Sequence, residues 1–118
     1  MQPPTLEQLS KLETAFSFRF PPAYLAFIER LPAPFLDSLP RARFVVSADE
    51  IRDAHREGMP PTLMPFLIES QPRHADYYCF DSSTTAPEYA VVVFAVHVTV
   101  AQWTNLADWI KWLEQRPS

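Results

Sequence analysis

Glycine and cysteine are almost absent from this chain, and each shortage excludes a class of site. The sequence of 118 residues contains 1 Gly and 1 Cys but 13 Pro. Phosphate-binding loops, dinucleotide fingerprints and kinase-type flaps all need several glycines, so the sequence excludes these nucleotide sites. The lone Cys79 excludes an intrachain disulfide and a multi-cysteine zinc site, and it is typical of a reducing compartment.

An excess of basic residues and long apolar runs are also lacking. Ten Lys and Arg against 14 Asp and Glu give a net charge of −4, which disfavours binding to nucleic-acid phosphates. The longest apolar run, 89–96, is far shorter than the ~20 residues that a membrane-spanning helix needs. The segment 1–5 has no signal-peptide pattern. We therefore expect a cytoplasmic protein that binds neither nucleic acid nor membranes.

The length and the pattern of apolar residues predict one α+β domain over residues 1–118. Helical spacing and capping residues predict helices that start after Thr5, at Pro21, after Ser47 and after Thr104 or Asn105. Alternation predicts strands at 43–46, 63–68, 76–81 and 89–100, the last being one long strand or two. Strands grouped between helices indicate a mainly antiparallel central sheet of four to six strands, packed with about four helices.

Single residues predict two local features. Gly58, the only glycine, falls where the third helix should end, which favours a left-handed C-terminal cap. Pro65 lies inside a predicted strand and cannot donate to a sheet, so that strand should be an edge or irregular strand.

Three stretches, in an order and spacing that cover nearly the whole chain, carry a family resemblance. The first, 6–28, contains Phe20-Pro21-Pro22-Ala23-Tyr24; the second joins Leu63-Met64-Pro65-Phe66 to Asp76-Tyr77-Tyr78-Cys79-Phe80-Asp81; the third is 106–113. Together they resemble the SUKH superfamily, which includes fungal Smi/Knr-type cell-wall regulators and many bacterial immunity proteins. The resemblance implies the α+β fold expected above.

The same resemblance implies a function without chemistry. Bacterial members commonly bind a protein toxin, often a nuclease, and block it, whereas fungal members act as regulators or scaffolds. We therefore expect a non-catalytic domain without cofactors, a monomer or weak homodimer, whose partner is a cognate bacterial toxin. The alternative is a constitutive scaffold or regulatory module of the Smi/Knr type without a toxin partner.

Acidic residues near the ends of the predicted strands supply a candidate protein-binding surface. With two neighbouring tyrosines we expect them to line one rim of the sheet, the full set being Glu69, Asp76, Tyr77, Tyr78, Asp81 and Glu88. Such a rim would imitate phosphate charge and dock onto the basic active site of a nuclease. The alternative is that these are solvated charges at strand ends, with Asp81 beginning an ordinary turn.

Two aromatic side chains are further binding candidates. Phe35, beside Leu36, lies in a proline-rich segment, 31–40, whose stiffness would favour recognition of a partner. Trp112 falls off the apolar stripe of the last predicted helix, so it should be partly exposed. The alternative for Trp112 is that it covers the edge of another element.

The sequence supports a catalytic or metal-binding site less well than it supports a protein-binding surface. Cys79 would need His74 or His97 and an acid such as Asp76, but alternation puts Cys79 and Asp76 on opposite sheet faces. A metal site from His74, Asp76, Asp81 and His97 has no recognised ligand spacing. We expect Cys79 to be a buried thiol, His97 to be a sheet-face histidine, and the protein not to be an enzyme.

Overall fold

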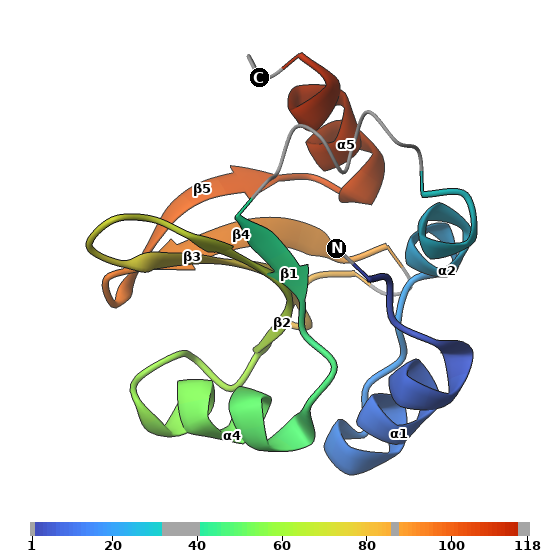
Figure 1. The fold of residues 1–118 in the computed structure, drawn as a ribbon, viewed down its shortest axis with the longest axis horizontal. Coiled ribbons are helices and arrows are strands. Elements are labelled where there is room, and N and C mark those ends of the chain that lie inside the picture. The colour runs from blue at the N-terminus through green and yellow to red at the C-terminus, as the bar shows by residue number, and fades with distance from the viewer. Residues whose placement is uncertain (1, 32–40, 86–87, 116–118) are drawn as a thin grey trace.

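A five-stranded antiparallel sheet forms the centre of the fold (Figure 1). The computed structural model describes residues 2–31, 41–85 and 88–115. The elements are α1 (Leu6–Phe16), α2 (Pro22–Glu29), β1 (Ala42–Phe44), α4 (Ala48–Arg56), β2 (Leu63–Ser70), β3 (Ala75–Asp81), β4 (Ala90–Ala95), β5 (Val98–Trp103) and α5 (Leu106–Glu114). The strand order is β1-β2-β3-β4-β5, with every neighbouring pair antiparallel. The predicted α+β class and antiparallel sheet are confirmed.

The helices begin at the residues that the sequence indicates. The side chains of Thr5, Ser47 and Asn105 each accept a hydrogen bond from the backbone N–H three residues on. At α4 the Glu50 carboxylate accepts a hydrogen bond from Arg43 at 2.8 Å. No helix within the described ranges is both long and apolar enough to cross a membrane.

The end of α4 depends on the single glycine. Gly58 has φ +119, a conformation that residues with a side chain rarely adopt. Its N–H donates to the His55 carbonyl at 3.2 Å, and the Met59 N–H donates to the Ala54 carbonyl at 3.1 Å. This pair of bonds is the Schellman arrangement, and the buried Met59 and Ala54 side chains pack in one cluster beside it. The predicted glycine cap is confirmed.

The sheet has a core on each face. Tyr78 and Phe80 of β3 point into the larger core, which contains side chains of α1, α2 and α5. Cys79, between them, points into a smaller core with Met59. In Figure 1 the sheet lies between α5 and α4. The predicted alternation along β3 is therefore confirmed.

Pro65 makes β2 irregular without placing it at the edge of the sheet. β2 lies between β1 and β3, but β1 pairs only with Leu67, Ile68 and Glu69. The pairing of β2 with β3 shifts register between Pro65 and Leu67. Pro65 thus lies beyond the end of β1, where its missing N–H removes no hydrogen bond to that strand.

An unpartnered hydroxyl lies inside the larger core. The ring centroid of Tyr24 lies 5.3 to 5.4 Å from those of Phe20, Phe66 and Phe80. The Tyr24 hydroxyl is buried and has no hydrogen-bond partner in the described part of the chain. Burial raises its pKa far above the usual value for tyrosine, so the group stays protonated.

Replacing Tyr24 with Phe should therefore raise the free energy of unfolding by about 1 kcal/mol, because burying a hydroxyl without a partner costs about 1 to 3 kcal/mol. Urea unfolding monitored by fluorescence measures the difference. Tyr78→Phe is the matched control, since the Tyr78 hydroxyl donates to Glu69 at 3.1 Å and its loss should destabilise. A Tyr24→Phe variant that loses as much stability as Tyr78→Phe would show that the Tyr24 hydroxyl makes a stabilising hydrogen bond.

Candidate interaction surface around the β4–β5 hairpin

The structure divides the predicted acidic rim between opposite ends of the sheet. Asp76 pairs with Glu69 beside the loop that joins β2 to β3. Asp81 pairs with Ala90 at the other end of β3, and Glu88 lies in the connection before β4. In an antiparallel sheet, successive connections alternate between the two ends, so the two ends of one strand cannot share a rim. The prediction of one acidic rim is wrong.

Two members of that set are internal. Glu69 is only 5% exposed, and it accepts the hydrogen bond from Tyr78. Tyr78 lies in the larger core, where its ring packs at 5.4 Å from Trp109. Both side chains are buried in this structure, so neither is exposed for contact with a partner.

The remaining acidic residues have local partners or open surroundings. Asp76 accepts hydrogen bonds from Gln71 at 3.2 Å and from His74 at 3.0 Å. Asp81 accepts from the backbone N–H and the hydroxyl of Ser83 at 3.0 and 2.6 Å, so it holds the turn that the alternative reading expected. Glu88 is exposed. A role for these residues in binding stays a prediction.

Of the two aromatic candidates, Phe35 and Trp112, the structure describes Trp112. Phe35 and the segment 32–40 lie outside the described residues. Trp112 is 38% exposed, and its ring centroid lies 5.0 Å from that of Trp103 at the end of β5. Trp112 is thus partly exposed, as expected, and also packs against another element.

Cys79 does not meet the groups that would activate it. The thiol is fully buried and lies 3.6 Å from the Tyr77 carbonyl. Burial raises the pKa of Cys79 well above its usual value, and the charge of Asp81 raises it further. Across residues 2–31, 41–85 and 88–115, no group of three His, Cys, Asp or Glu side chains is placed to hold a metal ion.

The turn between β4 and β5 carries backbone strain and exposed apolar side chains. Val96 and His97 form a two-residue turn with φ of 50 and 66, an arrangement that favours Asn-Gly and that a β-branched residue rarely adopts. His97 is therefore a turn residue, and its predicted place on a sheet face is wrong. Val96, Val98 and Val100 are 67%, 55% and 58% exposed. We call Val96, His97, Val98 and Val100 the hairpin surface.

The hairpin surface continues along an edge strand. Within the described ranges β5 pairs only with β4, and the residues from Val98 to Trp103 carry no charge. Exposed edges are usually protected by charged residues or proline. An uncharged edge with exposed valines is therefore a surface suited to contact with another protein.

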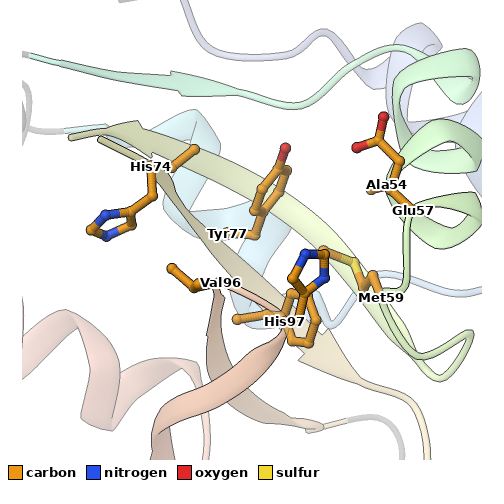
Figure 2. A pocket seen from close by; sticks show the side chains of 9 residues that line it. Ala54, Glu57, Met59, His74, Tyr77, Val96 and His97 are labelled. Atoms are coloured by element: carbon orange, nitrogen blue, oxygen red, sulfur yellow. The ribbon is translucent and has the colours of Figure 1, made fainter. Parts of the chain in front are cut away.

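A small pocket lies beside the hairpin surface (Figure 2). It encloses about 170 Å³ and is lined by Ala54, Glu57, Met59, His74, Ala75, Tyr77, Phe94, Val96 and His97, which we call the Tyr77 pocket. The end of α4, strand β3 and the two loops at one end of the sheet meet there. A Cβ atom on Gly58 would lie 3.3 Å from Nδ1 of His97, so the glycine leaves room for the imidazole ring.

Acidic groups predominate among the charges that act on Tyr77 in this pocket. Burial raises the pKa of the Tyr77 hydroxyl, and the charges of Glu50 and Glu57 raise it further. Arg43 acts in the opposite direction. No Lys or Arg lines the pocket.

The sequence alone did not single out Glu57, Met59 or Val96. Gly58 was the available signal for the first two, because it ends α4 and they are its neighbours in the sequence. The sequence did not indicate the turn at Val96 and His97, because valine continues the apolar pattern of both strands. An Asn-Gly pair at these positions would have indicated a turn.

Comparison with known proteins identifies a family. A family model described as SUKH_5, SMI1-KNR4 cell-wall, matches residues 1–113. No curated protein and no solved structure matches the chain significantly.

The turn strain predicts the effect of a substitution at its first residue. Val96→Asn should raise the free energy of unfolding by about 1 kcal/mol, because asparagine tolerates the left-handed region that costs other residues about 1 to 2 kcal/mol. Guanidinium chloride unfolding measures the change. Val100→Asn is the control, because Val100 is similarly exposed but has no positive φ. The control should be neutral or destabilised, and equal losses in both variants would show that the turn is not strained.

The burial of Cys79 predicts slow chemistry at its thiol. In the native protein it should react with a disulfide reagent at least about a thousandfold more slowly than in the unfolded chain, because reaction requires opening of the core. A Ser10→Cys variant supplies an exposed thiol as an internal reference. Comparable rates for the two thiols would mean that Cys79 is accessible and would revive the nucleophile reading.

Proposed function

Because the chain belongs to the SUKH superfamily, we propose that it is a non-catalytic protein-binding domain that binds and blocks a cognate bacterial protein toxin. The block would be steric and electrostatic, without any bond being made or broken. The toxin would be held in the cytoplasm, in keeping with the free thiol of Cys79. A nuclease is the toxin class that the family resemblance suggests first.

The observation that carries the proposal is the hairpin surface. Its turn keeps valine in a backbone conformation that valine disfavours, and the side chain is largely exposed to solvent, where it gains little packing within the fold. Strain of this kind gathers where proteins recognise other molecules. The exposed valine would recover its burial in a complex.

Two further features support binding to a protein. In the part of the chain that the structure describes, the outer edge of β5 has no partner strand and its side chains are uncharged, which suits close contact with a partner surface. The net charge of −4 would steer the domain toward a basic partner and raise the association rate.

The test is capture of the partner with two forms of the protein, wild type and Val96→Asn. We expect one stoichiometric partner that is toxic when expressed alone and harmless when co-expressed with the wild type, with nanomolar or tighter affinity. Val96→Asn should weaken that affinity by about tenfold or more, as loss of an interface anchor does, although it stabilises the free domain. Opposite signs for stability and affinity separate lost contact from misfolding.

Leu6→Asn is the matched control. Leu6 is 61% exposed at the start of α1, outside the hairpin surface, so its loss should leave affinity unchanged. Several partners of micromolar affinity, none of them toxic, would replace the toxin-blocking proposal with the scaffold alternative. An equal effect of both substitutions would show that binding does not use the hairpin surface.

A further inference from the structure

The Tyr77 pocket is sized for one side chain. Its volume is about 170 Å³. Pockets for small-molecule ligands are larger, about 300 to 1,000 Å³. The space instead suits the tip of a side chain presented by a protein that rests on the hairpin surface, since Val96 and His97 belong to both.

The lining chemistry selects a cation. Glu57 is a carboxylate at the pocket that has no ion pair within the described ranges. Tyr77 and His97 supply aromatic rings. The face of an aromatic ring attracts a cationic group. His74 donates to Asp76 at 3.0 Å, so a carboxylate also stands behind the imidazole at that wall. An anionic group would meet the Glu57 carboxylate with no lining lysine or arginine to offset it.

The shape of the lining favours arginine over lysine. A guanidinium group is planar, stacks on aromatic faces and can bond both oxygens of a carboxylate, whereas an ammonium group is compact and strongly hydrated. The apolar side chains of Ala54, Met59 and Phe94 would cover the methylene groups of the entering chain.

We propose that the Tyr77 pocket receives an arginine side chain of the protein partner, stacked on the rings of Tyr77 and His97 and paired with Glu57. This proposal rests on the proposed protein-binding function, and it specifies which side chain of the partner the pocket binds. Arginine is among the residues that contribute most to interfaces. A basic anchor on the partner also fits the net charge of −4.

The test uses a probe and needs no partner. N-acetyl-arginine N-methylamide is titrated into the isotope-labelled protein at pH 7.5, and chemical shifts are followed by NMR. We expect saturable shifts at Ala75, Tyr77 and His97 with a dissociation constant on the order of 1 to 10 mM, the range of a single weak contact. The citrulline analogue has the same shape without the charge, and it should not bind measurably.

Two variants locate the carboxylate. Glu57→Gln should weaken the arginine probe about fivefold or more, whereas Glu29→Gln, the same change at an exposed residue of α2, should leave it unchanged. The proposal is overturned if the arginine probe gives no saturable shift, if the citrulline probe binds equally, or if the two variants behave alike. A lysine probe that binds at least as tightly overturns the choice of arginine. Failure here leaves the partner capture interpretable, because that experiment reads the hairpin surface.

Discussion

The fold depends on the irregularity in β2 at Pro65 and Phe66. Where the register shifts, the consecutive residues Phe66 and Leu67 both join the larger core, so β2 presents two adjacent side chains to one face. Phe66 stacks on Phe80 with ring centroids 4.3 Å apart, and its ring also meets that of Trp109 edge-on at 5.3 Å. This stack joins β2 and β3 to α5 in one aromatic assembly, and Tyr24 of α2 packs against both phenylalanines. A regular strand would point Leu67 to the face opposite Phe66. The proline inside a central strand is therefore part of how the core closes.

The order of the strands brings the residues of the candidate site together. Because β2, β3, β4 and β5 are joined as successive antiparallel neighbours, the loop after β2 and the turn after β4 meet at one end of the sheet. His74 comes from the first of these connections and His97 from the second. The Schellman ending of α4 directs the chain at Gly58 past the His97 ring, and Glu57 lies one residue earlier. Residues that are far apart in the sequence thus line one pocket because of hairpin topology and a single glycine.

Local chemistry explains which parts could be predicted from the sequence. Helix starts at Thr5, Ser47 and Asn105, and the helix end at Gly58, follow from side-chain and backbone hydrogen bonds within a few residues. The two faces of β3 follow from alternation. The candidate surface did not follow, because it depends on which strand ends share an edge of the sheet, and this in turn depends on pairing between distant residues. Placing Asp76 and Asp81 on one rim required two ends of one strand to coincide, which an extended strand forbids.

Three described residues other than glycine have a positive φ, and they separate structure from function. Ser17 has φ 50 at the end of α1, where the Phe18 N–H donates to the Glu13 carbonyl at 3.1 Å, so its conformation is explained by the helix ending that it forms. Val96 and His97 have the same handedness, but Asn-Gly would form their turn with less strain. The fold therefore requires the turn but does not require these two side chains. His97 gains contacts at Gly58 and in the Tyr77 pocket, whereas the exposed Val96 gains few within the chain. Contacts that offset the strain at Val96 would therefore come from a bound partner. The turn at Val96 and His97 is the place where binding would change the free energy most.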